Sequence, residues 1–203
     1  VKDELMKYEH FDQDTIVEKY EELAEKYDQT LLDVVGYPDP SKIVEAMEKV
    51  GITKDAPILD FGCGTGLIGK YCQDKGYTNL VGIDASPEML EKAKGRGYNE
   101  LKEVFLGANQ FPSELEGKFE VAVSAGVLAH GHVSSELFDE KIKCLKPIQS
   151  EDDKRYMIFT TREQYLETLG YGEKLKQLED SGKIEYVDKL NFTVRRQEDE
   201  FFS

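Results

Sequence analysis

Three alternating glycines constrain this chain more than any other feature of its sequence. Gly62, Gly64 and Gly66 lie in the run Asp60-Phe-Gly-Cys-Gly-Thr-Gly66, after the short apolar run Pro57-Ile-Leu59 and before apolar residues at helical spacing. Because glycine has no Cβ, a strand-to-helix turn of this composition lets the backbone approach a ligand closely. The unpaired N–H groups of the helix that follows favour a carboxylate or a phosphate. The run therefore predicts a ligand-binding turn in an α/β fold.

Two acids end neighbouring predicted strands. Asp60 precedes the glycines, and Asp84 ends the apolar run Leu80-Val-Gly-Ile83, 20 positions after Gly64. An acid at the end of the second strand binds a ribose diol in nucleotide-binding α/β folds, whereas Asp60 suits a ligand with an ammonium group better than one with a pyrophosphate. Ser86-Pro87-Glu88 predicts the start of the next helix. The ligand that these two acids describe is S-adenosylmethionine.

The sequence resembles the class I S-adenosylmethionine-dependent methyltransferases over roughly residues 15 to 190. The first two motifs of that family match residues 58–66 and 81–90. Residues 20–28, 36–38 and 126–133 narrow the resemblance to the methyltransferase-like proteins of the Williams–Beuren syndrome chromosome region group. The resemblance implies an α/β fold with a Rossmann-like, mainly parallel sheet, helices on both faces and an N-terminal helical lid. It also implies in-line transfer of the cofactor's methyl group to a small-molecule or protein acceptor.

The resemblance also implies which residues bind the cofactor. Many family members place an Asp after the third strand to accept a hydrogen bond from the adenine amino group. Here the Asn109 carboxamide could accept it and the Ala108 N–H could donate to the ring, although Asn109 could equally be an ordinary polar loop residue. The full set of expected cofactor-binding residues is Tyr20, Tyr27, Asp60, Gly62, Cys63, Gly64, Thr65, Gly66, Asp84, Ala85, Met89, Ala108, Asn109 and Ala125.

Two histidines are the candidate catalytic residues. His130 and His132 follow the fourth predicted strand, in a segment that the resemblance places beside the transferable methyl group. Either has a pKa suited to removing a proton from the acceptor, and either could instead only cap a loop by hydrogen bonding. Tyr20, Tyr27 and Tyr37 are open in the same way, since they could form the lid or simply pack in the core. No metal site is predicted.

Two other functions fit part of the pattern. Residues 64–69 also match the G-x-G-x-x-G fingerprint of dinucleotide-binding domains, which predicts an NAD-binding oxidoreductase, but the leading Asp60 and Gly62 favour S-adenosylmethionine. A non-catalytic adaptor that binds S-adenosylmethionine would carry the same motifs, because a fold does not by itself guarantee an activity.

Composition narrows the partners. The net charge is −15 and no basic stripe is visible, which argues against direct binding of nucleic acid. No apolar run approaches the ~20 residues that span a membrane, and the N-terminus has no signal-peptide pattern. The three cysteines are scattered, which suggests reduced thiols and a cytoplasmic protein.

Alternating periodicity predicts the elements. Helices are expected over 14–35, 41–50, 66–76, 87–95, 134–145 and 163–181, and strands near 57–61, 79–84, 103–106, 119–124, 155–160 and 184–190. Together they form one methyltransferase domain over 1–203, with an N-terminal helical cap or lid over 1–50 and a Rossmann-like core over 51–203. The family's seventh strand would follow Arg196, where too few residues remain. Either residues 192–196 contribute it in an unusual way or the chain has been cut short, and we expect the second.

Overall fold

The computed structural model describes residues 38–107, 111–129, 131, 133–150 and 152–192. Within them, one sheet holds five parallel strands in the order β3-β2-β1-β4-β5. The strands are β1 (Ile58–Phe61), β2 (Leu80–Asp84), β3 (Glu100–Glu103), β4 (Val121–Leu128) and β5 (Tyr156–Thr161). The helices are α4 (Asp39–Lys49), α5 (Leu67–Asp74), α6 (Pro87–Ala93), η3 (Ser113–Leu115), α7 (Leu137–Cys144), α8 (Glu163–Thr168) and α9 (Tyr171–Asp180). The predicted Rossmann-like α/β fold is confirmed.

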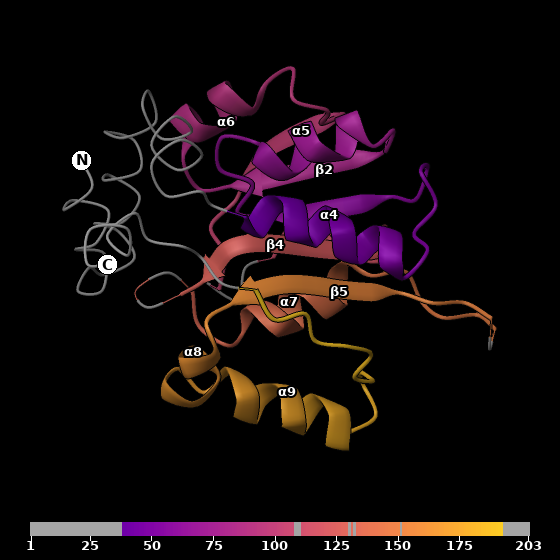
Figure 1. Cartoon of the computed structure of the whole chain (residues 1–203), viewed down its shortest axis with the longest axis vertical. Coiled ribbons are helices and arrows are strands. Elements are labelled where there is room, and N and C mark those ends of the chain that lie inside the picture. Colours follow the sequence, from indigo (N-terminus) through magenta and orange to yellow (C-terminus); the bar gives the residue numbers. More distant parts are fainter. Residues whose placement is uncertain (1–37, 108–110, 130, 132, 151, 193–203) are drawn as a thin grey trace, which may run out of the picture.

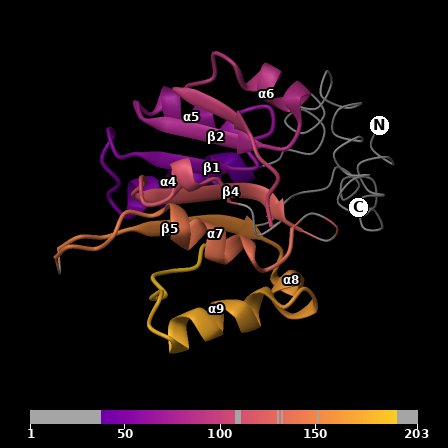
Figure 2. The ribbon, with the colours of Figure 1, turned by 180° about the vertical axis from the view of Figure 1, so that it is seen from behind.

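Helices cover both faces of the sheet (Figure 1, Figure 2). On the face with α4 and α5, Met47 of α4 and Ile58 of β1 belong to one buried apolar cluster. On the opposite face, Phe138 of α7 lies edge-on to Phe159 of β5 and to Tyr171 of α9. The central strands are therefore buried on both sides, as a parallel sheet requires.

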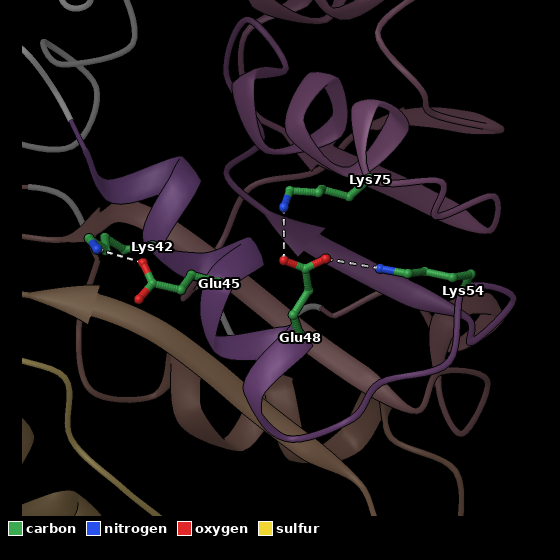
Figure 3. Close-up of polar contacts among 5 residues, drawn as sticks. All are labelled: Lys42, Glu45, Glu48, Lys54 and Lys75. Atoms are coloured by element: carbon green, nitrogen blue, oxygen red, sulfur yellow. Dashed lines mark hydrogen bonds and ion pairs between the residues drawn. The ribbon is translucent and has the colours of Figure 1, made fainter.

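Exposed ion pairs fasten α4 to its neighbours (Figure 3). Glu48 accepts hydrogen bonds from Lys75 at 3.1 Å and from Lys54 at 3.3 Å. These two bonds hold the pKa of the Glu48 carboxyl below its usual value. Lys42 and Glu45 form a further pair on the same helix. The cap predicted over residues 1–50 therefore includes a helix that packs on the sheet.

The third strand lies earlier in the chain than the sequence predicts. It was expected near 103–106 and is found at Glu100–Glu103. Its pairing with β2 ends at Asp84 and Glu103, because β2 itself ends there and offers no further partner. Val104 and Leu106 pack in the core instead. They are apolar because they are buried, although they do not belong to a strand.

Two predictions near the C-terminal end are wrong. The helix expected over 163–181 is two helices, because Gly170 between α8 and α9 has a left-handed φ of 71°, which interrupts a right-handed helix. Residues 184–190, expected as a sixth strand, form no strand. Two exposed ion pairs, Lys49 with Asp188 and Lys189 with Glu163, link this segment to α4 and α8.

Several predictions fall outside the described residues. The helix expected over 14–35 and most of the cap or lid expected over 1–50 lie in residues 1–37, and the place of the seventh strand lies within residues 193–203. These stay predictions.

Candidate functional site

The described part of the predicted site lies at the carboxyl edge of the sheet. Because the strands are parallel, β1, β2 and β4 all end at this edge, where open α/β sheets bind their ligands. The glycine loop leaves β1 after Phe61 and enters α5 at Leu67. The N–H groups of Gly62 and Cys63 both donate to the Ile83 carbonyl, at 2.8 and 3.0 Å. The loop is thereby fastened to the end of β2.

The three loop glycines differ in their surroundings. All three have a left-handed φ, which is 67° at Gly62, 53° at Gly64 and 88° at Gly66. A Cβ on Gly62 would lie 2.5 Å from the Val127 side chain, and one on Gly66 would lie 3.0 Å from Ala93. Around Gly64, no described residue comes within 4 Å of such a Cβ. Gly62 and Gly66 therefore permit packing within the protein, whereas Gly64 leaves room for a ligand.

Asp84 holds this loop from the neighbouring strand. Its Oδ2 accepts the Gly64 N–H at 2.8 Å, and its Oδ1 accepts the Ser86 N–H at 3.0 Å. Burial raises the pKa of the carboxyl, and the hydrogen bonds from Ser86 and Gly64 oppose the rise by stabilising the charged form. Asp84 keeps some exposed surface, and each carboxylate oxygen has a second lone pair. The same carboxylate can therefore accept a hydrogen bond from a ribose hydroxyl.

Helix α6 begins as the sequence predicts. Ser86 is its N-cap, with Oγ accepting the Met89 N–H at 3.2 Å, and Pro87 occupies the first turn. Ala85 is partly exposed and Met89 is buried at 2% exposure. Of these two predicted cofactor contacts, Ala85 has surface to offer a ligand, and Met89 packs beneath the helix start.

Asp60 is fully buried at the end of β1, at 0% exposure. The Tyr98 hydroxyl donates to its Oδ2 at 2.6 Å, and among the described residues none bonds to its Oδ1. Burial raises the pKa of this carboxyl to about 7, opposed by the Tyr98 hydrogen bond and by Lys141. The structure therefore places Asp60 under the glycine loop, with one oxygen already engaged by the protein.

Lys141 is a second buried titratable side chain, and its amine interacts electrostatically with Asp60. Its Nζ lies 4.6 Å from the centre of the Phe61 ring and, within the described part of the chain, accepts or donates no hydrogen bond. Burial lowers the pKa of the amine to about 7, against the opposing influence of Cys144 and Asp60. Sequence patterns gave no sign of a lysine in this position, because α7 reads as an ordinary amphipathic helix.

Ala125 lies where β4 bends at the same edge. The register between β4 and β5 shifts between Ser124 and Leu128, and Gly126 has a φ of 72°. The Gly126 N–H donates to Thr160 Oγ1 at 3.2 Å. A bulge of this kind redirects strand residues beside a site, and Ala125 is partly exposed there.

Several predicted site residues lie outside the described residues, but the chain next to two of these segments is anchored. The Gly107 N–H donates to both Glu140 carboxylate oxygens at 3.1 Å. The Val133 carbonyl accepts from the Tyr171 hydroxyl at 2.8 Å. The predicted residues concerned are Tyr20, Tyr27, Ala108, Asn109, His130 and His132.

Sequence reasoning missed Tyr98, Glu140 and Tyr171. Each contacts the site through hydrogen bonds to residues between 29 and 38 positions away. Local spacing carries no signal for such contacts, because they depend on how the elements pack. A structure was needed to find them.

The geometry at this edge agrees with the comparison with known families. A family model for the methyltransferase domain matches residues 8–194. The chain belongs to the methyltransferase-domain family. The cofactor of this family is S-adenosylmethionine, as the sequence predicts.

Individual relatives of this methyltransferase domain extend the comparison. Methyltransferase-like protein 27 of Homo sapiens is 36% identical over 117 residues, which are 56% of this chain and 47% of that protein. It belongs to the Williams–Beuren group, so the predicted resemblance is confirmed. A TehB-like methyltransferase structure from Corynebacterium glutamicum has a TM-score of 0.50 at 22% identity, covering 74% of this chain and 82% of that one. That likeness shows a common fold.

Other matches are shorter. The 18S rRNA (guanine-N(7))-methyltransferase of Bos taurus is 49% identical over 53 residues, which are 25% of this chain and 18% of that protein. The chain also spans only about half the length of Methyltransferase-like protein 27.

In the part of this methyltransferase domain that the structure describes, no helix is long and apolar enough to cross a membrane. Its three cysteines, Cys63, Cys72 and Cys144, are free and buried.

Proposed function

We propose that this domain binds S-adenosylmethionine at the carboxyl edge of β1, β2 and β4 and transfers its methyl group to a small-molecule or protein acceptor. The observation that carries this proposal is the pairing of Asp84 with Gly64 at 2.8 Å. It joins a partly exposed acid to the one loop glycine at which no described residue would meet an added Cβ. At the ends of adjacent strands, the acid can accept hydrogen bonds from the ribose hydroxyls. The glycine backbone can approach the amino-acid part of the cofactor closely.

The described residues suggest a role for each part of the site. Asp84 would accept from the ribose hydroxyls, with Ala85 beside the adenosine. The start of α5, where the N-cap residue Gly66 makes no side-chain cap hydrogen bond, would meet the carboxylate of the cofactor. Ala125 at the bend of β4 would line the same space. When bound, the cofactor supplies a methyl group on a sulfonium, and the protein orients the acceptor toward it.

The remaining roles rest on residues outside the described part of the chain. We propose Ala108 and Asn109 for adenine recognition, and Tyr20 and Tyr27 for the lid. The lid would exclude water from the methyl group. The proposal also gives His130 or His132 the task of removing a proton from the acceptor. Support comes from the anchored neighbours of two of these segments, Gly107 and Val133.

The net charge favours an acceptor other than nucleic acid. A charge of −15 repels phosphates unless a partner supplies positive surface. Although one relative is named for rRNA methylation, that match covers a quarter of this chain. The free thiols are typical of a reducing compartment, and we propose a cytoplasmic location.

Two measurements test this function. Calorimetry should show binding of S-adenosylhomocysteine, the demethylated cofactor, and no binding of NAD. Labelled S-adenosylmethionine, incubated with the protein and a cell extract, should then label a metabolite or a protein. Binding without any labelled product would instead indicate the adaptor, and binding of NAD alone would overturn the proposal.

A further inference from the structure

A tyrosine from outside the glycine loop caps the helix that follows the loop. The Gly69 N–H, in the first turn of α5, donates to the Tyr98 hydroxyl at 3.0 Å. The N-cap residue is Gly66, which has no side chain to accept this hydrogen bond as Ser, Thr, Asp or Asn would. Tyr98 therefore supplies from the segment before β3 the cap that the loop's own sequence lacks.

The Tyr98 ring occupies a space that three glycines leave open. A Cβ on Gly69 would lie 2.2 Å from the ring, one on Gly82 would lie 2.9 Å from it, and one on Gly66 would lie 3.1 Å from it. Real Cβ atoms do not approach another atom so closely, so any side chain at Gly69 or Gly82 would displace the tyrosine. This packing explains Gly69, the last glycine of the apparent dinucleotide fingerprint, without a dinucleotide.

The same hydroxyl engages the acid that precedes the loop. Tyr98 accepts from Gly69 and donates to Asp60 Oδ2 at 2.6 Å, so one hydroxyl links the end of β1 to the start of α5. Asp60 is at 0% exposure. Oδ1 of Asp60 has no hydrogen-bond partner among the described residues, but the whole side chain is buried. The hydrogen bond at Oδ2 fixes the direction of the Tyr98 hydroxyl.

We propose that Tyr98 is a positioning residue for the cofactor, and that Asp60 supports the glycine loop through Tyr98 instead of binding the cofactor's ammonium group itself. This inference rests on the proposed function, since it concerns affinity for the same cofactor. The loop leads directly into the helix that Tyr98 caps, and a tilt of that helix moves the backbone at Gly64. A displacement of the loop backbone by about 1 Å is enough to weaken binding at a preorganised site.

Three substitutions separate this role from direct contact. Tyr98→Phe keeps the ring and removes the hydroxyl. We expect its affinity for S-adenosylhomocysteine to fall about tenfold, because the start of α5 and the loop are then less well positioned. Asp60→Ala should cost about as much, and adding it to Tyr98→Phe should cost nothing more. Asp60→Asn should stay within about threefold of the wild type, because the amide oxygen still accepts from Tyr98.

Tyr77→Phe is the matched control. Tyr77 is a buried tyrosine in the same apolar cluster, but it lies beyond the other end of α5, so its loss should leave affinity unchanged. Calorimetry is done well below the unfolding temperature, and circular dichroism checks each fold. Amide exchange at Gly69 should become faster in Tyr98→Phe, since that N–H loses its acceptor.

Two results would overturn the inference. One is unchanged affinity in a folded Tyr98→Phe protein. The other is a tenfold or greater loss of affinity in Asp60→Asn, which would show that the negative charge itself binds the ligand. The Asp60→Asn result tests the inference even if Tyr98→Phe does not fold. If the wild-type protein binds no S-adenosylhomocysteine, the proposed function itself fails. That result is distinguishable from failure of this inference, which shows only as a difference between the variants and a wild type that binds.

Discussion

Two side-chain hydroxyls hydrogen-bond at the carboxyl edge, one on each half of the sheet. On the β1 side, Tyr98 accepts from a backbone N–H and donates to Asp60. On the β5 side, the Thr160 hydroxyl accepts from the Gly126 N–H at 3.2 Å. Burial raises the pKa of the Asp39 carboxyl, and the Thr160 hydroxyl opposes that rise. Asp60 is completely buried, whereas Asp39 is partly exposed.

The difference in burial between Asp60 and Asp39 indicates which side of the edge contributes more to stability and to its pH dependence. Burying a charged carboxylate costs more free energy in the interior than near water. We therefore expect disruption of the hydrogen bond at Asp60 to lower stability more than an equivalent change at Asp39. Tyr98 also fills space between α5 and the sheet, whereas Thr160 adds only a methyl group. We therefore expect changes at the β1 side to have larger effects than equivalent changes at the β5 side.

The largest effect should come from filling the space of the Tyr98 ring. Gly69→Ala places a methyl group 2.2 Å from that ring and 2.3 Å from the Arg96 carbonyl. Overpacking of this kind should lower the free energy of unfolding by about 3 kcal/mol, measured by denaturant unfolding. Gly64→Ala is the control, since its methyl group meets no described residue and should cost about 1 kcal/mol, from the left-handed φ alone. Equal losses would refute the role given to the ring.

Asp84→Asn should have the next largest effect. One amide oxygen replaces two carboxylate oxygens, so either Gly64 or Ser86 loses its acceptor. Affinity for S-adenosylhomocysteine should fall by about 1.5–3 kcal/mol. Asp74→Asn, at the exposed end of α5, is the control and should bind normally. An Asp84→Asn protein with full affinity would remove Asp84 from the site.

The buried acid predicts a pH dependence of stability. The pKa of Asp60 is raised from 3.8 to about 7, so between these values the folded state holds a proton that the unfolded state has lost. Folding stability should therefore fall as pH rises through this window and change little from this source above it. Asp60→Asn should flatten the fall, and Asp39→Asn should flatten it less. Melting temperatures from pH 4 to 8 make the measurement.

Lys141 predicts the opposite slope at higher pH. Its pKa is lowered from 10.5 to about 7, so between these values the unfolded state holds a proton that the folded state lacks. Stability should rise with pH across that window. Lys141→Met should remove the rise, and Lys143→Met, on the exposed side of α7, should preserve it. An unchanged slope in Lys141→Met would show that the amine is not the titrating group.

The smallest effect should come from the β5 side. Thr160→Val removes the acceptor of the Gly126 N–H, and the free energy of unfolding should fall by about 1 kcal/mol. Thr168→Val, at an exposed position of α8, serves as control and should change it by less than about 0.5 kcal/mol. A loss at Thr160 as large as that of Gly69→Ala would reverse the ranking of the two sides.

Local patterns predicted much of this fold and less of its site. The glycine run, the acid ending β2 and the Ser86 cap are encoded within a few residues, and the structure has each where it was expected. The third strand was misplaced because apolar side chains at 104 and 106 look the same in a strand and in a buried loop. Residues 184–190 have a strand-like composition, but composition cannot supply a pairing partner.

The role of Asp60 shows the limit most clearly. From the sequence it is an acid before a glycine loop, which predicts a ligand contact. In the structure its neighbour is Tyr98, 38 residues away. No local pattern indicates that hydrogen bond, because it depends on how the elements pack in the tertiary structure.

The central claim is that the open space at Gly64 receives the cofactor. The most direct test is titration of the wild type and of Gly64→Val with S-adenosylhomocysteine, with circular dichroism to confirm folding. No described residue would meet the first carbon of the new side chain, so the variant should fold, with the strain of a left-handed φ as its main cost. We predict that the wild type binds and that the folded variant does not. Normal affinity in a folded Gly64→Val protein would show that the loop is only a turn and would contradict the account.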